Sequence, residues 1–152
     1  MSGLEHKVPP PFVLLILALL MWFANHLMGG GVASTMLFYG GLLLLALGFG
    51  VAFTSLRTLI GNHTTPSPIE IERAKVLVTS GPYRFTRNPT YLGMLIFLIG
   101  VAALFANVWL LAGPVAFALY IQRFQITPEE RVMAAKFGAD YSNYCAQVRR
   151  WI

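Results

Sequence analysis

Residues 80–93, with the sequence SGPYRFTRNPTYLG, gather the side chains of this chain that are best suited to binding chemistry. Two arginines and two tyrosines lie within or beside two turns, Gly81-Pro82 and Asn88-Pro89, which restrict the backbone around them. Cations and aromatic rings held in this way bind polar molecules that carry charge. A charge-free apolar stretch follows directly. The pattern therefore predicts a rigid polar binding site at a hydrocarbon boundary.

A second group of charged side chains, Arg123, Glu129 and Glu130, follows the last apolar stretch. The glutamates are compatible with helix capping, because Thr127 is a good N-cap, Pro128 suits the first helical position and Glu130 completes a capping box. Two adjacent acids exceed what a cap requires, which indicates a further use. Arg123 lies at about headgroup depth, where it either snorkels to the interface or holds an anion inside the helix bundle.

The elements that must position these side chains are apolar helices. The chain is 57% hydrophobic and 11% charged, whereas soluble domains carry about 25% charged residues. No acidic or basic residue occurs from Val8 to Leu56 (49 residues) or from Asn88 to Gln122 (35 residues). A membrane-spanning helix needs about 20 apolar residues. The composition thus predicts an all-α polytopic membrane protein, a single domain over residues 1–152 with about four transmembrane helices.

The predicted spans cover residues 11–28, 32–57, 90–105 and 108–126. The last two form a helical hairpin that turns at Asn107, and three glycines, 29–31, separate the first two. A cytoplasmic loop over 58–89 and short cytoplasmic helices over 128–150 complete the chain, with Gly138 ending the first of these helices. A cleaved signal peptide is the competing interpretation of the first apolar run, but no small-x-small cleavage site closes it.

The charges of the chain predict its orientation. The formal net charge is +5, and all 11 basic residues fall in the N-terminal segment, between Arg57 and Arg87, or in the region that starts at Arg123. The positive-inside rule then puts both termini and the active site in the cytoplasm, in a plasma membrane that the compact size suggests is prokaryotic. Membrane lipids are the expected partners. The sequence has no stripe of basic residues interleaved with aromatic ones, so nucleic-acid binding is not expected. The single cysteine and the scattered histidines predict no metal site.

Five sequence features, taken in order, resemble the isoprenylcysteine carboxyl methyltransferase family, which is related to membrane phospholipid methyltransferases. They are GPYRFTRNPTYLG, an apolar hairpin, EE, FG and YSNY, and together they cover about residues 78–150. The resemblance implies that S-adenosylmethionine binds at the cytoplasmic ends of the last membrane helices. It implies a cofactor pocket formed by Tyr83, Arg87, Asn88, Pro89, Tyr91, Gly93, Glu129 and Glu130, and no metal.

The same resemblance matches Arg123 to an arginine implicated in catalysis or substrate handling. The family often has Arg-His-Pro where this chain has Arg87-Asn88-Pro89. Asparagine keeps a turn-forming, hydrogen-bonding side chain but carries no charge, which puts an acid–base role at Asn88 in doubt.

The leading hypothesis is a membrane methyltransferase that uses S-adenosylmethionine to methylate a lipophilic acceptor, an isoprenylcysteine-like carboxylate. Glu129 or Glu130 would hold the cofactor ammonium, and Arg87 or backbone N–H groups would hold its carboxylate. The first alternative is N-methylation of a phospholipid amine, which would require a base near the acceptor. The second is a non-enzymatic scaffold or transporter subunit. A transporter should carry ionisable residues near mid-membrane, and none of the predicted spans places one there.

Overall fold

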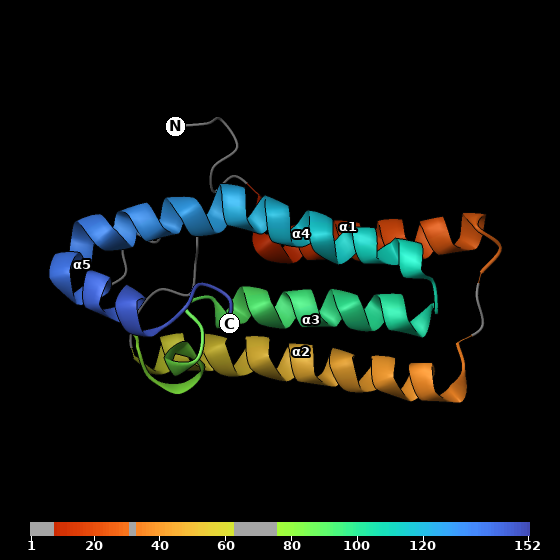
Figure 1. Cartoon of the computed structure of the whole chain (residues 1–152), viewed down its shortest axis with the longest axis horizontal. Coiled ribbons are helices and arrows are strands. Elements are labelled where there is room, and N and C mark those ends of the chain that lie inside the picture. The colour runs from red at the N-terminus through yellow and green to blue at the C-terminus, as the bar shows by residue number, and fades with distance from the viewer. Residues whose placement is uncertain (1–7, 31–32, 63–75) are drawn as a thin grey trace.

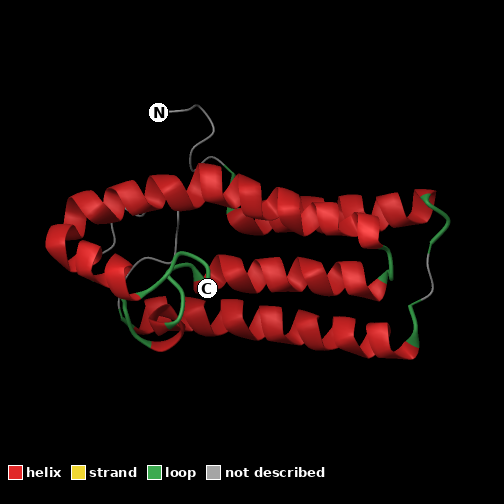
Figure 2. Ribbon diagram, in the orientation of Figure 1, coloured by secondary structure: helices red, strands yellow, loops and turns green. Residues whose placement is uncertain are grey.

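The computed structural model describes residues 8–30, 33–62 and 76–152, and every regular element among them is helical (Figure 2). The main helices are α1 (Pro10–Leu27), α2 (Thr35–Gly61), α3 (Pro89–Leu104), α4 (Ala112–Ile121) and α5 (Thr127–Gln147). Short 3₁₀ turns, Gly81–Arg84 and Val108–Leu111, precede α3 and α4. Helices α1 to α4 run side by side, and α5 extends beyond them and bends back (Figure 1). The all-α prediction is confirmed.

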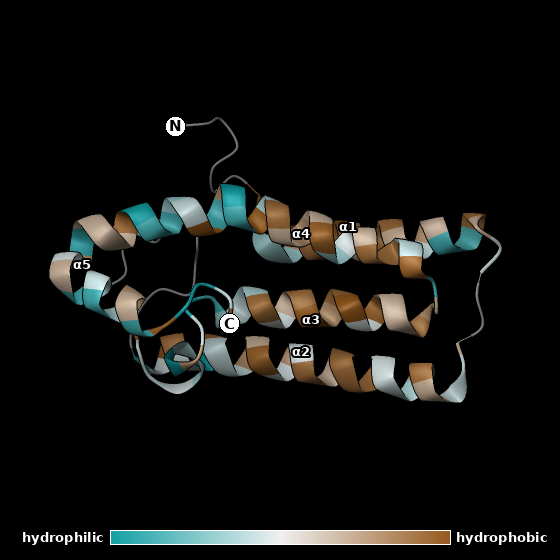
Figure 3. Ribbon diagram, viewed as in Figure 1, coloured by the Kyte–Doolittle hydropathy of each residue, from teal (hydrophilic) through white to brown (hydrophobic). Residues whose placement is uncertain are grey.

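Two helices, α1 and α2, are long and apolar enough to cross a membrane, whereas α3 is a shorter apolar helix and α4 has 10 residues. Apolar residues dominate α1 to α4, and hydrophilic residues are concentrated on α5 (Figure 3). Large apolar side chains such as Leu19, Phe23 and Phe49 are exposed on α1 and α2. An exposed apolar surface of this kind is typical of a face that contacts lipid. Helix α2 also continues past the predicted boundary at 57 and ends at Gly61. Of the predicted 58–89 loop, residues 63–75 lie outside the described part of the chain.

Helices α2 and α3 approach closely because glycines line their contact. A Cβ on Gly48 would lie 2.6 Å from the carbonyl oxygen of Gly93, and a Cβ on Gly93 would lie 2.6 Å from the backbone nitrogen of Ala52. Gly41 and Gly100 form a second contact of the same kind, with a Cβ on Gly100 3.0 Å from the carbonyl oxygen of Gly41. Small residues at helix contacts are a common packing device in membranes. The α2–α3 pair is therefore a closely packed hairpin that fixes the start of α3.

Helices α4 and α5 form one continuous helical path through a π-helical turn, Gln122–Ile126 (Figure 1). The prediction that Thr127 is an N-cap is therefore wrong: Thr127 has helical backbone angles, and its hydroxyl donates to the Gln122 carbonyl at 2.7 Å. Pro128 has no N–H to donate to the carbonyl four residues earlier. A local change to π-helical geometry is one way in which a helix passes such an interruption.

Gly138 interrupts α5, with φ 50° and ψ −119°, and the helix reverses there. The predicted break at Gly138 is confirmed. The reversal brings the C-terminal residues back toward the start of α3 (Figure 1). The turn predicted at Asn107 is also present, with the Asn107 side chain accepting from the Trp109 N–H at 3.1 Å.

Candidate functional site

Polar side chains converge where the starts of α3 and α5 meet the 3₁₀ turn and the C-terminal residues. We call this group the polar cradle and define it by its members: Tyr83, Arg87, Tyr91, Glu129, Glu130 and Arg150.

Glu129 lies among hydroxyl groups of the cradle. The Tyr91 hydroxyl donates to its Oε1 at 2.5 Å. Although Glu129 retains some exposed surface, burial of its carboxyl group raises its pKa to about 8, the Tyr91 hydrogen bond lowers it and the charge of Glu130 raises it further. Burial also raises the pKa of Tyr83 to about 12, a hydrogen bond with Thr90 opposes this, and Glu129 adds to it. At neutral pH, Glu129 is therefore largely protonated in the ligand-free chain.

Glu130 is held by two guanidinium groups. Arg150 donates from Nε to Oε1 at 3.0 Å and from Nη2 to Oε2 at 2.6 Å, a bidentate arrangement. Arg87 Nη2 lies 3.0 Å from Oε1, in an ion pair whose side chains are 14% and 19% exposed. The bonds to Glu130 raise the pKa of Arg150. The two neighbouring acids thus differ: Glu130 is neutralised by arginines, and Glu129 has a tyrosine partner.

The C-terminal residues close the cradle through their backbone. The Arg149 carbonyl accepts from the Arg87 N–H at 3.0 Å. The Arg150 carbonyl accepts from the Asn88 side-chain amide at 2.9 Å and from the Thr86 hydroxyl at 3.1 Å. These bonds span more than 60 positions in the sequence, so they hold the turn before α3 and the end of the chain as one unit.

A second tie joins α5 to the same turn. The Tyr144 hydroxyl donates to the Tyr83 carbonyl at 2.6 Å, and burial raises the pKa of Tyr144 well above its usual value. Tyr144 therefore stays neutral and acts as a hydrogen-bond donor.

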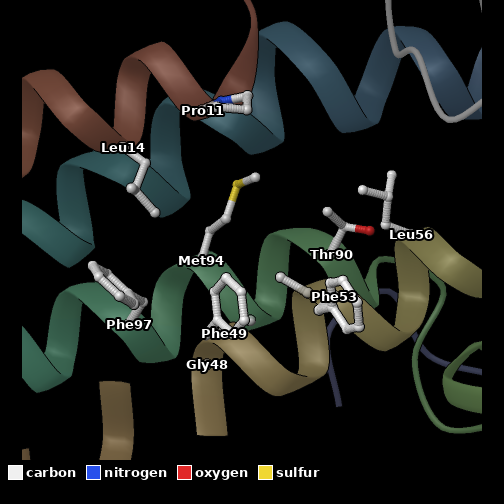
Figure 4. A pocket seen from close by; sticks show the side chains of 11 residues that line it. Pro11, Leu14, Gly48, Phe49, Phe53, Leu56, Thr90, Met94 and Phe97 are labelled. Atoms are coloured by element: carbon white, nitrogen blue, oxygen red, sulfur yellow. The ribbon is translucent and has the colours of Figure 1, made fainter. Parts of the chain in front are cut away.

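An apolar cavity of about 340 Å³ lies beside the cradle, between α1, α2 and α3 (Figure 4). Thr90, Gly93, Met94 and Phe97 form its α3 wall, and their spacing places them on one helix face. Its other lining residues are Pro11 and Leu14 of α1 together with Gly48, Phe49, Ala52, Phe53 and Leu56 of α2. Because Tyr91 is next to Thr90 in the first turn of α3, the cavity and the cradle share that turn.

The structure brings together six of the predicted site residues: Tyr83, Arg87, Asn88, Tyr91, Glu129 and Glu130. Pro89 is buried as the first residue of α3, where its fixed φ starts the helix. Gly93 lies against α2 and lines the cavity, so its missing Cβ serves helix packing as described above. Arg123 is exposed on the π-helical turn, with its guanidinium carbon 5.6 Å from the centroid of the Phe124 ring.

Sequence reasoning missed two residues. The charge pattern indicates Arg150 only as part of the positive-inside signal, and no spacing rule pairs it with Glu130 across the reversal at Gly138. Gln125 is fully buried in the π-helical turn, and its side-chain oxygen has no hydrogen-bond partner among the described residues. A lone polar residue between apolar Phe124 and Ile126 was the available signal for Gln125.

The cradle offers both signs of charge. The buried Nε atom of Arg87, a partly exposed residue, has no hydrogen-bond partner among the described residues, and Glu129 becomes an anion when it ionises. The arrangement can bind a molecule that carries both an anionic and a cationic group. Within the described ranges, no group of three His, Cys, Asp or Glu residues is placed to hold a metal ion.

Comparisons with known proteins give a consistent family. The chain is 32% identical over 111 residues to protein-S-isoprenylcysteine O-methyltransferase A of Arabidopsis thaliana. The aligned residues cover 71% of this chain and 55% of that protein. It is 33% identical over 76 residues to protein-S-isoprenylcysteine O-methyltransferase of Schizosaccharomyces pombe, covering 48% of this chain and 31% of the relative. The chain thus spans about half the length of the plant relative, or less for the yeast one. The family model described as phospholipid methyltransferase matches residues 35–140, from α2 into α5, and the chain belongs to this family.

Proposed function

We propose that this chain is a membrane methyltransferase that uses S-adenosylmethionine to methylate a lipophilic acceptor, an isoprenylcysteine-like carboxylate. Family membership and the names of the relatives support this proposal. The names of these relatives favour an isoprenylcysteine carboxylate over a phospholipid amine as the acceptor.

One observation carries the proposal: the first turn of α3 borders two sites of opposite character. Tyr91 donates to Glu129 in the polar cradle, and Thr90 and Gly93 line the apolar cavity. A transfer between a water-soluble donor and a lipid-bearing acceptor requires a polar and an apolar site at contact distance, because proximity supplies much of the rate enhancement.

The cradle residues fit the charged groups of the cofactor. Glu129, when ionised, would hold the ammonium group, and the unpartnered Nε of Arg87 would hold the carboxylate. Tyr83 and Tyr91 provide aromatic faces for a cation or a ring. When bound, S-adenosylmethionine supplies a methyl group that its sulfonium already activates. The chain itself therefore has to bind, orient and exclude water.

The acceptor site needs no general base. A carboxylate is ionised at neutral pH, so it can act as a nucleophile without losing a proton. The apolar cavity would hold the lipid part of the acceptor. The exposed guanidinium of Arg123 would orient its carboxylate at the membrane surface.

The decisive experiment offers purified protein the labelled methyl donor and both acceptor classes, N-acetyl-S-farnesylcysteine and phosphatidylethanolamine. Label in the farnesylcysteine ester supports the proposal, and label only in the phospholipid identifies an amine methyltransferase. Calorimetry with S-adenosylhomocysteine covers the non-enzymatic alternative. No heat at high protein concentration, together with no label in either acceptor, would favour a scaffold or transporter subunit.

We also propose that the cradle and both termini face the cytoplasm, with four helices in the membrane. The positive-inside pattern supports this orientation. Ala139 is exposed beside the bend of α5, and Cys145 is the only cysteine of the chain. In a Cys145→Ser background, Ala139→Cys should react with an impermeant thiol reagent only after the cytoplasmic face is opened. Reaction in intact cells would reverse the orientation.

A further inference from the structure

Gln125 is a buried polar residue that neither the cradle nor the cavity uses directly. It is 0% exposed, and it lies in the π-helical turn four positions before Glu129. Its Nε2 donates to the Val8 carbonyl at 2.8 Å, across 117 positions of sequence, while its Oε1 has no hydrogen-bond partner in the described part of the chain. A buried amide oxygen without a partner is costly, by about 1–3 kcal/mol. Such a group calls for an explanation.

The π-helical turn that presents Gln125 is held by its own bonds. The Gln122 carbonyl accepts from both the backbone N–H and the hydroxyl of Thr127, and the Gln122 side chain accepts from Trp151 Nε1 at 3.1 Å. Helical turns of this kind are rare and frequently occur at functional sites. In this chain the turn directs two consecutive side chains, Gln125 and Ile126, into the interior.

The partner of Gln125 begins the wall of the cavity. Val8 is followed by three prolines, which lack N–H groups, and α1 starts at Pro10. Pro11 and Leu14, in the first turns of α1, line the apolar cavity. The bond from Gln125 to Val8 therefore joins that wall to the helix that bears Glu129.

We infer that Gln125 is a positioning residue that sets the place of the α1 wall, and with it the fit of the lipid part of the acceptor. This inference rests on the proposed function for its substrate. Gln125 acts through α1, so its loss should weaken acceptor binding without altering cofactor binding.

The test variant is Gln125→Met, which keeps the length of the side chain and removes both the donor and the unpartnered oxygen. The free energy lost with the hydrogen bond to Val8 is offset by removal of the buried oxygen that has no partner among the described residues, so the folded state should persist. The matched control is Asn25→Leu, which also replaces a buried amide with an unpartnered oxygen but at the far end of α1.

Three measurements are made on both variants and on the wild-type chain. The first is KM for N-acetyl-S-farnesylcysteine, with kcat. The second is the affinity for S-adenosylhomocysteine and, separately, for a dansyl-labelled farnesylcysteine. The third is hydrogen exchange of the Phe12 and Val13 amides, which donate to the Pro9 carbonyl at 2.9 and 3.4 Å.

For Gln125→Met we expect about a tenfold rise in acceptor KM and a matching loss of dansyl-probe affinity. Cofactor-product affinity should stay within twofold, and exchange at Phe12 and Val13 should accelerate. Asn25→Leu should leave all of these unchanged. The inference would be overturned if Gln125→Met left hydrogen exchange unchanged, or if it accelerated exchange without changing KM and probe affinity. An equal rise in KM in Asn25→Leu would also overturn it. If the wild-type chain methylates neither acceptor, the proposed function fails, and probe binding with hydrogen exchange still decides the role of Gln125.

Discussion

Tyr91 and Glu129 are joined by a 2.5 Å hydrogen bond from the tyrosine hydroxyl to Oε1 of the carboxyl group. The bond connects the first turn of α3 to the first turn of α5, although 38 positions separate the two residues. Glu130 beside it is neutralised by Arg87 and Arg150. Of the two adjacent acids, Glu129 is therefore the one whose charge is available to a cationic ligand.

Ligand affinity should depend on pH through Glu129. Its pKa is about 8 in the ligand-free chain, so an ammonium group must bind the minor, ionised form at neutral pH. S-Adenosylhomocysteine affinity should rise between pH 6 and 8, by up to about tenfold per unit, with release of one proton near pH 7. Calorimetry in buffers of different ionisation enthalpy measures that proton. A flat profile would mean that Glu129 does not meet the ammonium group.

Replacing Tyr91 should move this profile. The Tyr91 hydrogen bond lowers the pKa of Glu129, so Tyr91→Phe should raise the pKa further and shift the rise in affinity to higher pH. Tyr39→Phe is the matched control, because Tyr39 is 65% exposed on α2. A profile shifted equally by both substitutions would rule out a specific effect on Glu129.

The two acids should also differ in their effect on stability. Because burial raises the pKa of Glu129 from 4.5 to about 8, the folded chain binds its proton more tightly than the unfolded chain. Stability is therefore lost from this group as pH rises from about 4.5 through 8, and Glu129→Gln should flatten that decline in thermal melts. Glu130→Gln leaves two guanidinium groups without their anion and should destabilise the fold by about 2 kcal/mol. Equal melting temperatures for the two variants at pH 7.5 would contradict this assignment.

The α2–α3 contact should tolerate no side chain at Gly48. A Cβ there would lie 2.6 Å from both the Gly93 carbonyl oxygen and the Phe97 nitrogen, which are backbone atoms. Gly48→Ala should cost about 1–3 kcal/mol in detergent unfolding. Gly50, on the same helix, has nothing within 4 Å of its Cβ position. Gly50→Ala should stabilise by about 0.5–1 kcal/mol, and the opposite ranking would show that the helices do not pack in this way.

Arg123→Ala tests the predicted catalytic residue. If the exposed guanidinium orients an acceptor carboxylate, turnover should fall at least about tenfold while S-adenosylhomocysteine affinity stays the same. Arg131→Ala is the control, because Arg131 is also exposed and lies on α5. Unchanged turnover would leave Arg123 as a surface cation near the lipid headgroups.

The helices were predictable because long charge-free stretches, glycine breaks and the turn at Asn107 are local signals. The predicted starts of the first and third helices differ by one residue from Pro10 and Pro89. The predicted capping role of Thr127 was wrong because sequence pattern does not reveal the π-helical turn. That turn makes α4 and α5 continuous, so Pro128 lies inside a continuous helical path instead of at its start.

The members of the candidate site were predictable where they share a motif, but their pairing was not. Glu129 and Glu130 are indistinguishable in sequence, and only the positions of Tyr91, Arg87 and Arg150 separate them. The resemblance implies a place for Gly93 in a cofactor pocket, and in the structure Gly93 lies against α2 and lines the apolar cavity. Contacts between distant segments depend on helix orientation, which local patterns do not encode.

The backbone of Arg149 and Arg150 completes the turn that precedes α3. During synthesis, α3 emerges from the ribosome well before residue 150 does. The side chains of Asn88 and Thr86 therefore cannot form their hydrogen bonds to the Arg150 carbonyl until the end of the chain has been made. The polar cradle can therefore assemble only after α5 has been made. A nascent chain that lacks Arg149 and Arg150 should insert its helices and still fail to retain S-adenosylhomocysteine.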